Sequence, residues 1–168
     1  MIYQFISCYN QHKKQGISVI EILIVVFIIG AALASLITIA NLSLVGAVQA
    51  KRTVQAESLA RGMIESSRNF RDGTSWNING LGGVVIGVPY HFEKSEDSQW
   101  QLSPDADNIL GFSSQLIFSD VFRDTSDNIV EQGGIKDPDS KKATVTVSWQ
   151  EKGRSHQVSL FAYFTNWQ

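Results

Sequence analysis

Among the residues whose type and spacing could support chemistry, Glu21 carries the most information. It lies in KKQGISVIEILIVVF, residues 13–27, and it is the only charged side chain between Lys14 and Lys51. An ionised carboxylate at the centre of a membrane helix costs about 2.5–3.5 kcal/mol, so an acid within an apolar segment indicates a function. A second interpretation is local, because Ser18 and Glu21 have the spacing of a capping box and an acid in the first turn suits the helix dipole. The two roles are compatible.

The other candidate residues for catalysis or ligand binding occur without their usual context. His91 and His156 have no CxxC or HExxH motif around them, which favours ordinary strand or surface histidines. The acidic runs 105–108 and 124–128 lack the glycine and the distal glutamate of a calcium-binding loop. The glycine-rich segment 80–83 is not followed by the lysine and the helix of a phosphate-binding loop. The sequence therefore predicts no enzyme activity, no metal site and no cofactor.

The composition excludes several other classes. The chain of 168 residues contains one cysteine, Cys8, so an internal disulfide cannot form. Its formal charge is −2, and Lys13 and Lys14 are the only charged residues before position 17, so from there on 12 basic residues face 16 acidic ones. This balance argues against a dedicated nucleic-acid surface.

Residues 17–40 form an apolar segment that as a helix spans about 36 Å, enough to cross a hydrocarbon core of about 30 Å. The basic residues His12, Lys13 and Lys14 precede it, which predicts a cytoplasmic N-terminus and an extracytoplasmic C-terminal domain. Two alternatives remain open from the residues alone. The segment is either an uncleaved anchor, or a secretory signal cleaved after Ala34 so that the mature chain begins at Ser35.

The helical pattern continues after Ala40 through residues 41–72, which contain no proline. Apolar residues recur there at helical spacing, which predicts an amphipathic helix that ends near Asp72 and Gly73. One helix from Ile17 to Asp72 is the favoured interpretation, and a break near Asn41 or Gly46 is the alternative. The predicted apolar stripe contains Val45, Val48, Ala56, Leu59, Ala60, Met63, Ile64 and Phe70.

Residues 73–168 read as a β-rich domain that begins with a glycine- and asparagine-rich loop. The clearest signal is period-two alternation over 142–149 and 156–164, separated by a turn at 151–154, which predicts a hairpin with one buried face. Further strands are expected at 84–92, interrupted by Pro89, at 98–102 and at 116–121, with a turn at 124–128. Packing the hairpin on the apolar stripe of the helix gives an α+β domain with a small antiparallel sheet.

The N-terminal pattern resembles the class III signal of type IV pilins and of type II secretion pseudopilins. Basic residues are followed by Gly16, an apolar residue at Ile17, and Glu21 at the fifth mature position. Ile17 replaces the more common phenylalanine, and Thr38 stands where many pilins have a proline. The hairpin end, residues 163–167, also resembles minor pilins of the PilV or GspI kind. The resemblance implies a pilin-like fold, cleavage by a prepilin peptidase between Gly16 and Ile17, N-methylation of Ile17, and a role for Glu21 in subunit docking.

The resulting expectation is a minor pilin or pseudopilin with a leader at 1–16, a transmembrane assembly helix at 17–40, its amphipathic continuation at 41–72 and a head at 73–168. Its implied partners are the prepilin peptidase, other pilin subunits, the assembly platform of the inner membrane and membrane lipid. The precursor would span the inner membrane once and reach the cell surface in a filament. The alternative function is an extracytoplasmic binding domain on an uncleaved single-pass anchor.

Overall fold

The structure, a computed structural model, describes residues 18–95 and 100–167. The chain divides into two compact units, one ending at Ala47 and one beginning at Val48. A single helix, α1, runs from Val19 to Gly73. The prediction of a continuous helix is therefore confirmed, and neither Asn41 nor Gly46 interrupts it. The predicted domain boundaries near residues 16, 40 and 72 stay predictions.

The last part of α1 packs on the sheet, and the sequence identified most of the contact face. Ala56 and Ala60 are fully buried, and Leu59, Met63, Ile64 and Phe70 pack against the same core. Two expectations were wrong, since Val45 and Val48 are exposed. Ser66 and Ser67 are buried instead, and the hydroxyl of Ser67 donates a hydrogen bond to the carbonyl of Met63 at 2.8 Å. A serine that satisfies its hydroxyl on its own helix can replace an apolar residue at such a contact.

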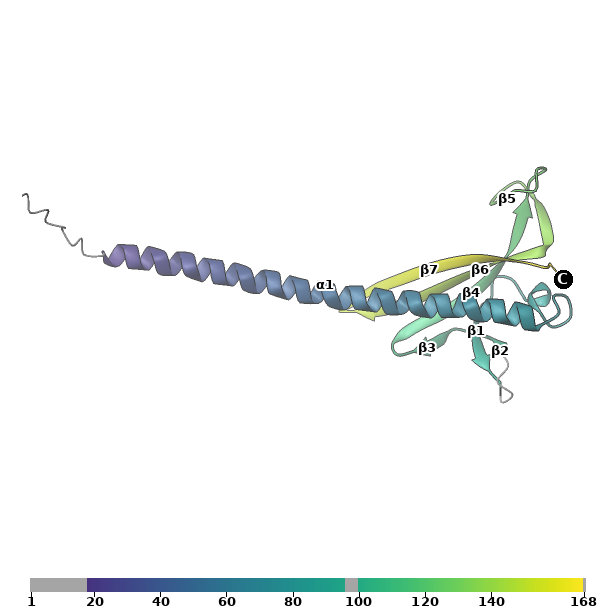
Figure 1. The fold of residues 1–168 in the computed structure, drawn as a ribbon, viewed down its shortest axis with the longest axis horizontal. Helices are drawn as coiled ribbons and strands as arrows, with labels where there is room; N and C mark the ends of the chain where they lie inside the picture. The colour runs from purple at the N-terminus through teal and green to yellow at the C-terminus, as the bar shows by residue number, and fades with distance from the viewer. Residues whose placement is uncertain (1–17, 96–99, 168) are drawn as a thin grey trace, which may run out of the picture. The chain divides into compact units, whose positions relative to one another are not determined.

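The sheet has seven strands, all paired antiparallel (Figure 1). Its order is β2-β1-β4-β6-β7, and β3 and β5 pair with opposite ends of β4. A short helix, η1, precedes the first strand and places Leu81 in the core. Together with α1 this gives the predicted α+β fold. The bounds are η1 Leu81–Gly83, β1 Pro89–Lys94, β2 Trp100–Pro104, β3 Asp107–Ile109, β4 Phe112–Arg123, β5 Ile129–Val130, β6 Ile135–Glu151 and β7 Arg154–Thr165.

The C-terminal hairpin has the predicted strands and the predicted buried face. Glu151 pairs with Arg154 across a two-residue turn in which Lys152 and Gly153 both have positive φ, 47° and 76°. Such a turn matches the right-handed twist of the strands it joins. The inner face of β6 is buried, and the facing residues of β7 are partly or fully buried. These inner residues are Ala143, Val145, Val147 and Trp149 on β6 and Val158, Leu160, Ala162 and Phe164 on β7.

The opposite face of the same strands carries mostly hydroxyl and amide side chains. Thr146 and Ser159 are 3.4 Å apart there, across the β6–β7 pair. No element among the described residues packs core side chains against this outer face. Its side chains include Ser113, Gln115, Thr144, Thr146, Gln157 and Ser159.

Several other strand predictions need correction. Residues 84–88 are not a strand, because β1 begins at Pro89, where a missing N–H at the first position breaks no ladder. The strand expected at 98–102 is β2, Trp100–Pro104, and β4 extends well beyond the expected 116–121. Neither β3 nor the first part of β6, Ile135–Lys141, was foreseen.

The first part of β6 is held by a bulge and by charges. Asp120 of β4 pairs with Lys141, whereas the next residue, Val121, pairs with Asp137, so that residues 138–140 are extra on β6. The carboxylate of Asp120 contacts Nζ of Lys136 at 2.8 Å and Nζ of Lys141 at 2.7 Å. Lys141 is buried, and its ammonium donates a hydrogen bond to the carboxylate of Asp120, which neutralises the buried charge.

Candidate functional site

The residue that the sequence singled out, Glu21, lies in the first turn of α1. The helix begins at Val19, directly after Ser18, whose carbonyl accepts hydrogen bonds from the amides of Glu21 at 3.0 Å and Ile22 at 3.3 Å. The start at Ser18 agrees with the capping prediction. The reciprocal side-chain bonds of a capping box do not occur between Ser18 and Glu21, both of which the structure describes. The local role of the carboxylate is therefore limited to its position at the positive end of the helix.

Glu21 is surrounded by exposed apolar side chains. Ile20 is 64% exposed, Ile22 is 52% exposed and Phe27 is 76% exposed. This part of α1 is long and apolar enough to cross a membrane, and none of that stretch is buried. Since water penalises such a surface, it requires a membrane or another protein around it.

Two hydroxyl side chains of this segment, Ser35 and Thr38, are satisfied by carbonyl groups of the same helix. The hydroxyl of Ser35 donates to the carbonyl of Ala31, and the hydroxyl of Thr38 donates to the carbonyl of Ala34, both at 2.9 Å. Such bonds lower the cost of placing hydroxyls in hydrocarbon. Thr38 therefore continues the helix at the place where a proline would remove a hydrogen bond.

Glu21 differs from these hydroxyls because it has no counter-charge in the part of the chain that the structure describes. The ion pairs of residues 18–95 and 100–167 all lie at or beyond Glu65. Gly16 and Ile17, the predicted cleavage and methylation sites, lie outside the described residues. Of the three predicted site residues, Gly16, Ile17 and Glu21, the structure describes only Glu21.

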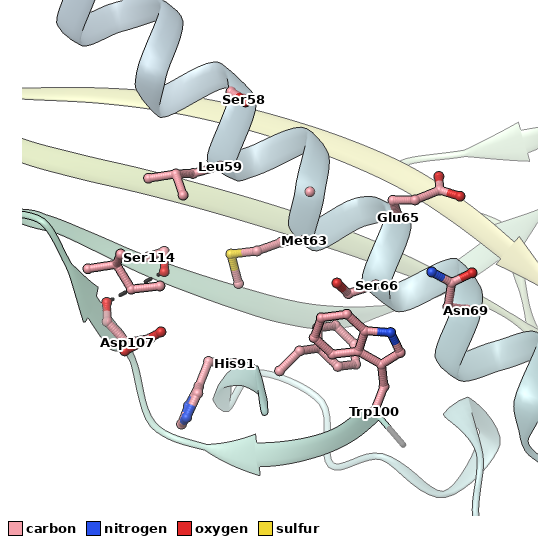
Figure 2. A pocket seen from close by; sticks show the side chains of 13 residues that line it. Ser58, Leu59, Met63, Glu65, Ser66, Asn69, His91, Trp100, Asp107 and Ser114 are labelled. Atoms are coloured by element: carbon pink, nitrogen blue, oxygen red, sulfur yellow. Dashed lines mark hydrogen bonds between the residues drawn. The ribbon is translucent and has the colours of Figure 1, made fainter. Parts of the chain in front are cut away.

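A second candidate lies in the head, as an open groove beside α1 (Figure 2). Its volume is about 460 Å³, and residues of α1, β1, β2, β3 and β4 line it. Leu59 and Met63 project into it from α1, and Trp100 faces them from β2. Polar groups stand around this apolar floor, and the pattern is that of a contact surface for a partly apolar molecule. They are Ser58, Glu65, Ser66, Asn69, His91, Asp107 and Ser114.

Among the described residues that line the groove, His91 is the one basic side chain, and its ring is held by neighbours. Its Nε2 lies 2.8 Å from the carboxylate of Glu93, and its Nδ1 lies 3.2 Å from the carbonyl oxygen of Asp105. In Figure 2 its imidazole points away from Met63. Hydrogen bonds from Ser103 and His91 lower the pKa of Glu93. With both ring nitrogens engaged, His91 positions β1 against the 105–107 turn.

The remaining residues considered for chemistry also have local structural partners. The carboxylate of Asp124 accepts the amides of Asn128 at 2.9 Å and Ser126 at 2.8 Å, and these bonds, first of all that of Asn128, lower the pKa of Asp124. His156 stacks on Trp149 with ring centroids 5.5 Å apart. Within residues 18–95 and 100–167, no three His, Cys, Asp or Glu side chains gather closely enough to hold a metal ion. The hydrogen bonds of Asp124 stabilise the turn at 124–128, which is a common role of aspartate in turns.

Comparisons with known proteins yield no similarity from which a function can be transferred. No family model matches the chain, no curated protein matches it, and no solved structure matches it.

Proposed function

We propose that this chain is a structural, non-enzymatic subunit of a filament of the type IV pilus or type II secretion kind, a minor pilin or pseudopilin. The observation that carries the proposal is Glu21, an acid in the first turn of an exposed apolar helix, five positions after Gly16. The continuous helix and its antiparallel head support it, because a pilin-like subunit needs both an anchor and an exposed domain.

The proposed docking step follows from the cost of a buried charge. Near the end of a membrane helix the carboxylate of Glu21 can reach the headgroups, but among packed helices of a filament it cannot. Cleavage after Gly16 would create an ammonium group on Ile17 that is charged near neutral pH, and methylation would keep the charge. The Ile17 ammonium of a neighbouring subunit is then the partner for Glu21. A wrong register between neighbouring helices leaves the carboxylate buried and unpaired. The free-energy cost of that unpaired charge favours the correct register.

The mature N-terminus provides the first test. We expect mass spectrometry of the native protein to find a chain that begins at Ile17, with or without a methyl group. A chain that begins at Met1 in cells with an active prepilin peptidase would contradict the proposal and support an uncleaved anchor. A chain that begins at Ser35 would indicate a secreted domain.

The second test replaces Glu21 by valine. We expect Glu21→Val to be cleaved normally but to enter filaments at a level reduced at least tenfold, since loss of a charge-pair contact in a low-dielectric site costs about 1.4 kcal/mol or more. Incorporation is measured by immunoblotting of sheared filaments against the membrane fraction. Glu57→Val, an acid of the same helix within the head unit, is the control and should assemble as the unchanged chain does. Equal incorporation of Glu21→Val would show that the carboxylate does not guide docking.

The alternative function, an extracytoplasmic binding domain on an uncleaved anchor, is favoured only by the groove beside α1. It needs neither Gly16 nor Glu21. Replacement of Gly16 distinguishes the two functions, because Gly16→Leu would block maturation of a pilin-like subunit and leave a simple anchored domain unaffected.

A further inference from the structure

The end of the head unit at which α1 enters it gathers residues from three separate segments. The guanidinium of Arg52 lies 5.6 Å from the ring centroid of Phe112, at the start of β4. Phe112 pairs with Trp149 and Trp149 pairs with His156, so the β3–β4 and β6–β7 turns lie at this same end. Figure 1 shows both turns at the same end of the sheet. Arg71, by contrast, contacts Phe164 at the other end of the unit.

This end is strongly basic, although the unit as a whole is acidic. Lys51 and Arg52 come from α1, and Lys152 and Arg154 come from the β6–β7 turn, with Glu151 as the one acid beside them. Three of the four cations are exposed and Arg52 is half-buried. None of the four takes part in an ion pair within residues 18–95 and 100–167. We call these four residues, together with Leu110, the basic end.

Leu110 adds an apolar contact to the four cations. It sits at the tip of the β3–β4 turn with a positive φ of 53°, and it is 87% exposed. Val48, Lys51, Arg52 and Leu110 line one open cavity of about 650 Å³. An exposed apolar side chain among basic residues is the composition of surfaces that bind the interface of an anionic membrane.

A short stretch of chain joins this end to the predicted membrane span. Only residues 41–47 separate Val48 from the predicted span at 17–40, and α1 is helical throughout them. These seven residues amount to about 10 Å of helix, close to the Debye length of about 8 Å at physiological ionic strength. The link is therefore short enough for cations of the head unit to come within a Debye length of the headgroups, where screening by salt is incomplete.

We propose that the basic end docks on anionic lipid headgroups of the membrane in which α1 is anchored, before the subunit enters any assembly. The phosphates of the lipids pair with Lys51, Arg52, Lys152 and Arg154, and Leu110 enters the apolar part of the interface. Docking fixes the orientation of the head at the membrane. The inference rests on membrane anchoring alone and requires neither cleavage after Gly16 nor filament formation, so a failure of those proposals leaves it standing.

The test uses the full chain, with Cys8→Ser, in lipid nanodiscs that hold one copy each. A fluorophore on Ser155→Cys, exposed beside Arg154, reports contact with lipids that carry a quencher on their headgroups. We expect strong quenching in discs with phosphatidylglycerol and little in discs with phosphatidylcholine alone. A fluorophore on Thr125→Cys, in the β4–β5 turn, should remain unquenched in both lipids.

Removal of charge separates docking from chance proximity. Each basic residue near an anionic surface contributes about fivefold, so Lys51→Gln, Lys152→Gln and Arg154→Gln together should lower the ratio of docked to undocked heads about a hundredfold. The matched control removes three cations from other places, Arg61→Gln, Arg68→Gln and Lys94→Gln, and should leave quenching unchanged. Near-ultraviolet circular dichroism verifies that both triple variants remain folded.

Three outcomes would overturn the proposal. Equal quenching in the two lipids would show that the cations are not recognised by anionic lipid. Equal effects of the two triple variants would show that overall charge, rather than the basic end, matters. Quenching that appears only in discs holding two or more copies would assign this surface to contact with the acidic part of another copy.

Discussion

At the scale of single residues, Glu21 and Asp120 are acids with different surroundings: Glu21 has no counter-charge among the described residues, and Asp120 has two. Glu21 stands alone in an apolar segment, and a lone charge there is visible without any knowledge of the fold. Asp120 gave no such signal, because an acid near a turn is common. Its importance comes from Lys136 and Lys141 of β6. The bulge in this strand brings both ammonium groups within reach of the Asp120 carboxylate.

The pair formed by Asp120 and Lys141 is buried, and this leads to a stability prediction. Asp120→Asn leaves the ammonium of Lys141 buried without its counter-charge, so we expect the free energy of unfolding to fall by about 3 kcal/mol. Urea unfolding of the full chain in detergent, followed by tryptophan fluorescence, measures the change.

The control for this prediction is an exposed pair on the same part of the sheet. Glu131 lies 3.9 Å from Lys142 and its side chain is 89% exposed, so Glu131→Gln should change the free energy of unfolding by less than about 0.5 kcal/mol. Similar losses for the two variants would mean that the pair of Asp120 and Lys141 is not effectively desolvated.

At the scale of elements, periodicity succeeded where it was regular and failed where charges or turns intervened. The alternation over 142–149 and 156–164 specified the hairpin and its buried face. The preceding segment, KDPDSKK at 136–142, has the composition of a loop and contains Pro138. It forms a strand because β4 pairs with it and because residues 138–140 are accommodated as a bulge. A single sequence does not reveal such tertiary support.

The contact between α1 and the sheet gives a second prediction. Ala60 is fully buried under the sheet, so Ala60→Leu overfills the core and should lower the free energy of unfolding by about 1–3 kcal/mol. Gly62, two residues further, has open space around the position of a Cβ atom, so Gly62→Ala should raise it by about 0.8 kcal/mol through helix propensity. Thermal unfolding of the two variants compares them. A destabilising Gly62→Ala would indicate that the groove side of α1 is in contact with something in the intact protein.

At the scale of the whole molecule, several acids respond to pH in the same direction. Lys136 and Lys141 lower the pKa of Asp120, and Asn128 lowers the pKa of Asp124. The pKa of Glu93 is also lowered, by Ser103 and His91. Because the unfolded chain, with pKa values near 4, binds protons more readily, the stabilisation is complete above about pH 5 and is lost as pH falls through the lower values of the folded state.

The prediction is a urea midpoint that is constant from pH 7 to pH 5 and falls steadily below about pH 4. Asp120→Asn should show a smaller fall over the same range, since it lacks one of the acids concerned. Midpoints measured at half-unit intervals of pH provide the comparison. A midpoint that rises on acidification would mean that protonation of these acids favours the folded state, contrary to the directions of their pKa shifts.

The outer face of β4, β6 and β7 has a consequence for the evolution of this protein. Its hydroxyl and amide side chains support no core, because α1 and the inner face of the sheet provide the packing. Exchanges among polar residues on such a surface change stability by less than about 0.5 kcal/mol. Polar side chains can thus replace one another on this face while the core and the architecture of the sheet stay constant.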